Sequence, residues 1–153
     1  MNINEVIEET LFLIRSEVLG NNVFFQTELG PQLPPVLGDR VQLQQVVLNL
    51  VKNGIEAMSG VQDRALQLRI RSARYEANQI VVAVADSGAG IDPQVVGRIF
   101  EPFYTTKLQG TGMGLAISRS IIEAHGGHLW VDPNPSKGAT FQYTLPADVE
   151  SVQ

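Results

Sequence analysis

The chain contains no cysteine, which excludes disulfides, thiolate nucleophiles and cysteine-ligated metals and leaves the redox compartment undetermined. Basic side chains are also scarce, because 11 Lys and Arg against 16 Asp and Glu give a net charge of -5. Such a chain has no general basic surface for nucleic acid or an anionic membrane. We therefore expect no nucleic-acid partner, and any bound phosphate must be held locally.

Long hydrophobic runs are absent as well. The longest unbroken apolar run, residues 80–85, is too short to span a bilayer, and the chain opens on an acidic amphipathic stretch unlike a signal peptide. We expect a cytoplasmic location, either of the whole protein or of one part of a membrane-bound sensor. A length of 153 residues with 44% hydrophobic content fits one domain. We place it at residues 1–146, followed by a frayed tail at 147–153.

Apolar residues at helical spacing predict three long helices, near residues 3–18, 40–58 and 114–125. Asp39 is the expected N-cap of the second helix, and Gln42, three residues later, gives something close to a capping box. A short helix is also expected from Asp92-Pro93 to about Phe100.

Five segments have the alternating or continuous apolar pattern of strands. They lie near residues 22–29, 66–71, 80–85, 128–131 and 139–145. Strands and helices that do not alternate strictly predict an α+β fold: a two-layer sandwich in which one mixed sheet of about five strands carries about three helices on one face. Four aromatic side chains are expected in the core: Phe24, Phe25, Trp130 and Phe141.

The second helix has an unusual polar face. Its polar side chains fall within a stripe roughly 80° wide, and they are Gln42, Gln45, Asn49, Asn53 and Glu56. A solvated face would be broader and richer in Lys and Glu, so a narrow stripe of amides indicates the wall of a pocket. Asn49 and Asn53 are four residues apart, and both carboxamide oxygens can point to one place, as a Mg²⁺ site requires.

Glycines punctuate two further segments. In DSGAG, Asp86 can present a carboxylate acceptor after an apolar strand, and Gly88 and Gly90 keep side chains away from a ligand. In GTGMGLAIS, Gly110, Gly112 and Gly114 lead into a helix, whose N-terminus favours an anion such as phosphate. The spacing fits neither the P-loop nor the dinucleotide-binding motif. Because six of the 14 glycines fall between residues 88 and 114, we favour a mobile lid over a flexible connector.

Neither histidine is expected to have a catalytic role. His125 stands at a helix end beside two glycines and is expected to be a C-terminal capping partner, and His128 opens a strand.

Five elements in fixed order across residues 39–145 carry a family resemblance. NLVKNGIEAM resembles the N box, DSGAGI the first glycine box, IFEPFYTTK the F box, GTGMGLAIS the second glycine box and KGATF the closing element of the ATP-binding superfamily that joins DNA gyrase, the ninety-kilodalton heat-shock chaperone, MutL and histidine kinases. The F box points to the histidine kinases. The resemblance implies a Bergerat-type fold and an ATP-binding catalytic domain that phosphorylates a histidine elsewhere.

The resemblance also implies roles for individual residues. Asp86 would accept a hydrogen bond from the adenine amino group, with Thr140 supporting the same edge through water. Asn53 would be the Mg²⁺ ligand, Asn49 a catalytic position beside the phosphates, and Lys107 the γ-phosphate contact. Phe100 and Phe103 would hinge and anchor the lid. The further nucleotide-binding positions would be Gly88, Gly90, Phe103, Thr106, Gly110, Thr111, Gly112, Met113, Gly114 and Leu115.

The chain departs from the family pattern at two points. Many members carry a phosphate-facing Lys where this chain has Glu56, and the phosphoacceptor motif, a His followed by an acidic residue and Pro, is absent. The expected partners are therefore a dimerisation and phosphoacceptor domain of the same kinase, outside this chain, and a response regulator. We expect the isolated domain to be monomeric and the whole kinase to be a homodimer.

Two alternatives stay open. The first is an ATP-hydrolysing relative, although the water-activating glutamate of that branch is replaced by Asn49. The second is a nucleotide-binding regulatory module without turnover.

Overall fold

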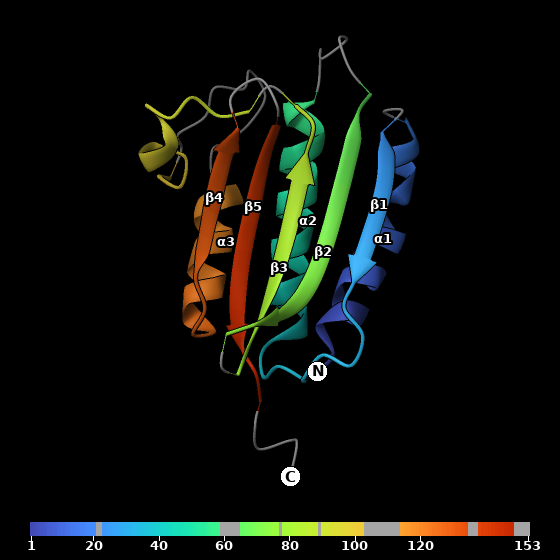
Figure 1. The fold of residues 1–153 in the computed structure, drawn as a ribbon, viewed down its shortest axis with the longest axis vertical. Coiled ribbons are helices and arrows are strands. Elements are labelled where there is room, and N and C mark those ends of the chain that lie inside the picture. Colours follow the sequence, from blue (N-terminus) through green and yellow to red (C-terminus); the bar gives the residue numbers. More distant parts are fainter. Residues whose placement is uncertain are drawn as a thin grey trace.

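The computed structural model describes residues 1–20, 23–58, 65–76, 78–88, 90–102, 114–134 and 138–148. Within these residues lie three α-helices, a 3₁₀ turn and one five-stranded sheet of order β1-β2-β3-β5-β4 (Figure 1). In chain order the elements are α1 (Ile3–Gly20), β1 (Phe24–Leu29), α2 (Arg40–Ala57), β2 (Gln67–Tyr75), β3 (Gln79–Asp86), η1 (Val96–Arg98), α3 (Gly114–Ala124), β4 (Leu129–Asn134) and β5 (Gly138–Pro146).

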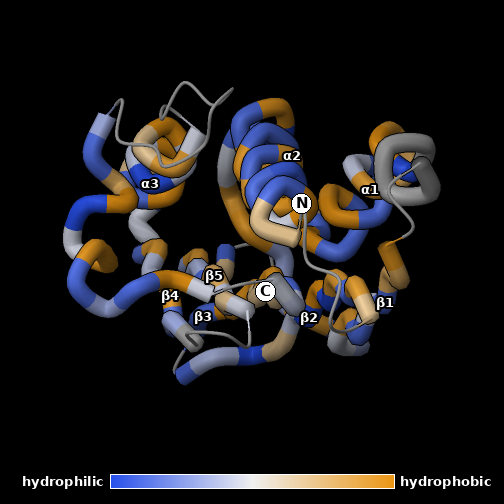
Figure 2. Tube along the Cα trace, turned by 90° about the horizontal axis from the view of Figure 1, so that it is seen from above, coloured by the Kyte–Doolittle hydropathy of each residue, from blue (hydrophilic) through white to orange (hydrophobic). Residues whose placement is uncertain are grey.

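The elements form two layers. Strand β1 runs parallel to β2 and the other neighbours are antiparallel, so the sheet is mixed. Seen along the layers, α1, α2 and α3 all lie on one side of the sheet, and no described element covers the other side (Figure 2). This arrangement confirms the predicted two-layer α+β fold.

Helix α2 is the centre of the hydrophobic core. Its start matches the prediction, because Asp39 Oδ1 accepts a hydrogen bond from the Gln42 backbone N–H at 3.0 Å. Its inner face is fully buried through Leu43, Val46, Val47, Leu50 and Val51. Alternate residues of β2 and β3 meet this face, among them Leu68, Ile70, Ile80 and Val82. The polar stripe therefore occupies the part of α2 that the core does not use.

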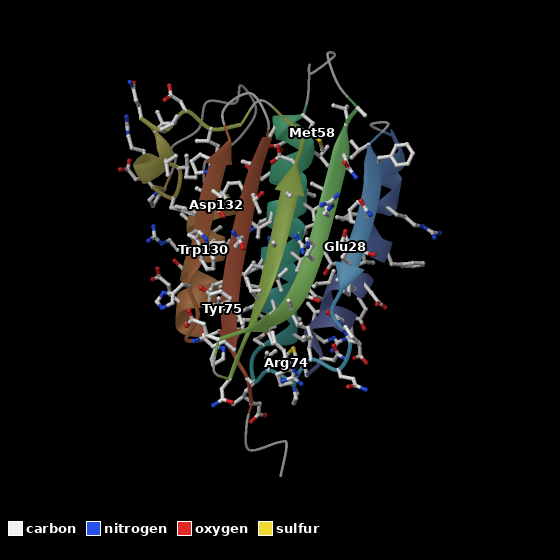
Figure 3. All side chains as sticks on the ribbon, viewed as in Figure 1. Glu28, Met58, Arg74, Tyr75, Trp130 and Asp132 are labelled. Carbon is white, nitrogen blue, oxygen red and sulfur yellow. The ribbon has the colours of Figure 1, made fainter. Side chains whose placement is uncertain are left out.

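Two aromatic side chains expected in the core lie elsewhere, so that prediction was wrong for them. Trp130 is half-buried on the sheet face without helices, where its ring pairs with Tyr75 at a centroid distance of 6.3 Å (Figure 3). Phe24, the first residue of the edge strand β1, is 77% exposed. For Trp130 the cause is strand alternation, because its neighbours Leu129 and Val131 take the core side of β4 and leave the opposite side for Trp130.

The segment after Pro93 is not the short helix expected up to Phe100. It contains only the 3₁₀ turn Val96–Arg98, preceded by a turn in which Asp92 Oδ1 accepts from the Gln94 N–H at 2.9 Å. Only Val96, Ile99 and Phe100 of this segment pack against the core. An apolar face this short favours single turns over a helix.

The start of the expected tail is hydrogen-bonded. The Ala147 N–H donates to the Asn78 carbonyl and the Asp148 N–H to the Pro35 carbonyl, both at 2.7 Å. The ordered domain therefore includes residues 147 and 148, and residues 149–153 lie outside the described part.

Tyr143 of β5 is fully buried on the core side, and its hydroxyl has no hydrogen-bond partner among the described residues. Tyr143→Phe should raise the free energy of unfolding at pH 7 by about 1–2 kcal/mol, because it removes a buried donor that folding leaves unpaired. Urea unfolding is the measurement, and Tyr75→Phe on the open face is the matched control. A lower stability for Tyr143→Phe would show that the hydroxyl has a partner.

The same substitution should change the pH dependence. Burial raises the pKa of Tyr143 above its ordinary value. A raised pKa in the folded state gives stability that is complete below the unfolded pKa of about 10 and is lost as the pH rises beyond it. The parent chain should therefore lose stability above pH 10 more steeply than Tyr143→Phe.

Candidate functional site

A buried carboxylate marks the end of β3. Asp86 is 9% exposed and lies on the same side of the sheet as Val82 and Val84. Its Oδ1 accepts hydrogen bonds from the backbone N–H of Gly88 at 2.8 Å and of Ala139 at 3.3 Å. Two backbone donors keep the carboxylate in a fixed orientation, as a buried charge requires.

Glycines allow three segments to approach this carboxylate. A Cβ on Gly88 would lie 2.4 Å from the Ala57 carbonyl oxygen, and one on Gly54 would lie 2.7 Å from Leu68 Cδ1 and 3.5 Å from Asp86 Cβ. Gly138 has φ +98°, and its Cβ would lie 2.0 Å from the Asp86 carbonyl oxygen. Three backbone segments therefore pack closely around Asp86: the end of α2, the turn after β3 and the start of β5.

The turn after β3 contains two further features. Gly90 has φ +80°, a left-handed conformation that favours glycine. Ser87, which the sequence analysis did not single out, ties this turn to the start of β2. Its hydroxyl accepts from the Gln67 N–H at 2.8 Å and donates to the Ala65 carbonyl at 3.0 Å. A serine after a strand gives no sequence signal for contacts 20 and 22 positions away.

The polar stripe of α2 reaches the start of α3 through Asn49. Its Nδ2 donates to the Gly114 carbonyl oxygen and to Ser118 Oγ, each at 3.2 Å, and its Oδ1 accepts from Gln45 Nε2 at 2.8 Å. Asn53 stands one turn further along α2 and is half-buried. Asn53 and Gly54 are consecutive, so the amide stripe ends next to the residue that packs against Asp86.

The structure does not bring the Thr140 side chain to Asp86. Thr140 is paired with Ala85, one residue before Asp86, and both belong to the sheet face without helices. Ala139, buried on the other face, donates its N–H to the carboxylate instead. The alternation of β5 places Ala139 on the same side as the buried Phe141, which is the signal that the sequence analysis missed.

Phe100, in the part of the F box that the structure describes, packs against β5 and α3. Its ring meets Phe141 edge to face at a centroid distance of 6.2 Å, and the Arg119 guanidinium lies 5.0 Å from the ring centroid. The Phe100 contacts therefore join β5 and α3. Gly114 and Leu115 form the first turn of α3, and Leu115 packs against the core.

Seven predicted nucleotide positions lie outside the described residues, and their roles stay predictions. They are Phe103, Thr106, Lys107, Gly110, Thr111, Gly112 and Met113.

His125 fixes the far end of α3, in the capping position that the sequence predicted. Its Nδ1 lies 2.7 Å from the Ile121 carbonyl oxygen, and its Nε2 accepts from the Asp39 N–H at 3.0 Å. Nδ1 therefore carries the proton of a neutral imidazole. His128 is exposed just before β4, and its backbone N–H donates to Thr144 Oγ1 at 3.3 Å.

No group of three or more His, Cys, Asp or Glu side chains within the described part of the chain could hold a metal ion. A Mg²⁺ ion that arrives with a nucleotide keeps its waters and phosphate ligands and needs only one or two protein oxygens. Asn53 can supply one. Among the described helices, none is long and apolar enough to cross a bilayer.

Comparisons with known proteins agree with these features. Residues 38–149 match the family model described as histidine kinase-, DNA gyrase B-, and HSP90-like ATPase. The chain is 43% identical over 150 residues to the sensor protein FixL of Bradyrhizobium diazoefficiens, a match that covers 98% of this chain and 29% of FixL. The chain thus spans less than a third of this relative's length.

Solved structures share the fold. The nucleotide-free catalytic domain of histidine kinase ThkA superposes with a TM-score of 0.83 at 36% identity, covering 96% of this chain and 93% of that one. ThkA in complex with the response regulator TrrA gives 0.81 at 33% identity, over 98% of this chain and 42% of ThkA. Full-length ShkA in complex with AMPPNP gives 0.84 at 26% identity, over 96% of this chain and 30% of ShkA.

The close approach at Gly88 gives a direct test of this geometry. Gly88→Ala should lower the free energy of unfolding by about 1–3 kcal/mol, because the added methyl group overlaps a backbone carbonyl that cannot move alone. Gly97→Ala is the control, since nothing lies within 4 Å of its Cβ position, and it should change stability by less than about 0.5 kcal/mol. Equal effects in urea unfolding would contradict the described approach of α2 to the turn.

Proposed function

Because this chain belongs to the histidine kinase-, DNA gyrase B- and HSP90-like ATPase family, we propose that it binds Mg-ATP and transfers the γ-phosphoryl group to a histidine of another domain. Its relatives identify it as a catalytic domain of the sensor histidine kinase type. The proposed reaction needs positioning and charge stabilisation more than covalent help from the protein, so the nucleophile can come from a separate domain.

The buried carboxylate of Asp86 is the observation that supports nucleotide binding most strongly. Oδ1 is held by two backbone N–H groups, which fixes the direction of the second oxygen. A fixed carboxylate oxygen in a protein interior selects a hydrogen-bond donor. The adenine amino group is such a donor, whereas the corresponding atom of guanine is a carbonyl oxygen. The Thr140 side chain lies on the sheet face without helices, and the group of β5 that holds the carboxylate is the Ala139 N–H.

We assign the phosphates to the part of the α2 polar stripe that contacts the start of α3. Asn53 would hold Mg²⁺, whose charge would offset the negative charge that develops on the transferred group. Lys107, in the predicted lid, would meet the γ-phosphate, and Asn49 would stand beside the phosphates. The structure of ShkA with bound AMPPNP supports an ATP-type ligand for this fold.

The partners of the whole protein are proposals too. We propose that a dimerisation and phosphoacceptor domain of the same polypeptide supplies the histidine and makes the kinase a homodimer. The phosphoryl group would then pass to an aspartate of a response regulator, in line with the ThkA–TrrA complex. Because the proposed reaction consumes ATP, we propose a cytoplasmic location for the domain.

Asp86→Asn tests the nucleotide site. The carboxamide keeps one oxygen for the Gly88 and Ala139 N–H groups and replaces the second acceptor by a donor. We expect affinity for ADP and ATP to fall roughly ten- to a hundredfold, with the melting temperature little changed. Asp132→Asn, an exposed position on β4, is the control, and GTP should bind the parent chain poorly. Calorimetric titration giving equal affinity for parent and Asp86→Asn would remove Asp86 from the site.

Phosphotransfer tests the reaction itself. Incubated with γ-labelled ATP, the chain should label a separately supplied phosphoacceptor domain and should not label itself on His125 or His128. Steady-state ATP hydrolysis by the lone chain should stay near background, because an amide at position 49 cannot take a proton from water. Glu56→Gln should leave that background unchanged. Strong phosphate release that Glu56→Gln abolishes would favour the ATP-hydrolysing alternative.

A further inference from the structure

The orientation of the Asn49 carboxamide is fixed by its neighbours. The Gly114 oxygen that it meets at 3.2 Å is a backbone carbonyl, which can only accept a hydrogen bond. The atom of Asn49 that faces α3 is therefore the nitrogen, and the oxygen points the other way. No such certainty exists for an asparagine that meets only hydroxyl groups or water.

Ser118 holds the same nitrogen from a second direction. Its side chain is fully buried in the α2–α3 interface, and its Oγ lies 3.2 Å from Asn49 Nδ2. By contrast, the Asn49 oxygen is met by Gln45, whose side chain is exposed. An exposed amide exchanges its partner for water at little cost, whereas a buried contact does not. Only the oxygen side of Asn49 can therefore change partners easily.

We propose that Ser118 is a positioning residue: together with the Gly114 carbonyl it locks the Asn49 nitrogen against α3, so that Asn49 meets the bound nucleotide complex through its oxygen alone. The partner of that oxygen is then the cation or a water bound to it. A bare phosphate oxygen is excluded, because two acceptors repel each other. This inference rests on the proposed Mg-ATP site and assigns Asn49 an acceptor role within it.

The lock can be tested without any activity. In the ¹⁵N-labelled 153-residue chain, the Asn49 side-chain amide protons should exchange slowly with water, and Ser118→Ala should shift one of them and speed its exchange. Ala lacks only the Oγ atom of Ser and favours the helix, so the fold should persist with a cooperative melt. Ser120→Ala, an exposed serine on the same helix, should leave the signal unchanged. An Asn49 signal that does not respond to Ser118→Ala overturns the lock.

The acceptor role is tested by binding with and without metal. Asn49→Ala should weaken Mg-ATP roughly three- to tenfold and metal-free ATP less than about twofold, because only the complex offers a cation or its waters. Equal weakening in both titrations would show that Asn49 donates to a phosphate oxygen, which overturns the acceptor role.

A double-mutant cycle tests whether Ser118 acts through Asn49. With the phosphoacceptor domain supplied separately, Ser118→Ala should lower kcat roughly three- to tenfold and change KM less than about twofold. Added to Asn49→Ala, it should cause no further loss. Losses that multiply, or a Ser118→Ala rate equal to that of the parent, would overturn the proposal. If the parent chain transfers no phosphoryl group, the proposed function fails, and the amide signal still decides whether Ser118 holds Asn49.

Discussion

A buried carboxylate must find donors without admitting water, and much of this structure follows from how Asp86 does so. Two backbone N–H groups donate to it, one from the turn after β3 and one from the start of β5. The two segments that carry these donors can come this close only where a Cβ atom is missing, and Gly88 and Gly138, the residue before the donor Ala139, meet that condition. Gly54 meets it on the side of α2. The site is therefore built from three segments that are distant in sequence, and its precision depends on their packing.

Helix α2 connects this carboxylate to the rest of the domain. Its apolar face rests on β2 and β3, and α3 is held against it by a polar contact at each end. Asn49 meets the start of α3, and the Asp39 N–H meets His125 at the end of α3. Two directional contacts on an antiparallel helix pair set its register, which apolar packing alone specifies less strictly. The polar stripe therefore belongs to a rigid frame.

The sequence predicted most of the fold because the segments that carry it are strongly periodic. The helices, the strands, the Asp39 cap and the turn glycines all depend on neighbours within a few residues, which a single sequence records. The errors have a different origin. Trp130 and Phe24 were assigned by residue type, although strand alternation placed each of them on the opposite face. Thr140 was assigned from the family resemblance, and strand alternation places its side chain on the sheet face without helices. Ser118 could not have been found, because its partner Asn49 lies 69 positions away.

The electrostatic polarity of the site would give the proposed nucleotide one direction. Near Asp86 the acceptors accumulate, because the Ala57 carbonyl at the end of α2 and Asp86 Oδ1 both border the Cβ position of Gly88, at 2.4 and 3.0 Å. An anion is unfavourable there, since a helix C-terminus is also the negative end of its dipole. Eight residues earlier on α2, about 12 Å along the axis, Asn49 meets the start of α3, where the dipole favours an anion. An adenine base that donates a hydrogen bond near Asp86, with its negatively charged phosphates near the start of α3, matches this electrostatic gradient. The reverse orientation would place the phosphates beside the acceptors and would be unfavourable at both ends.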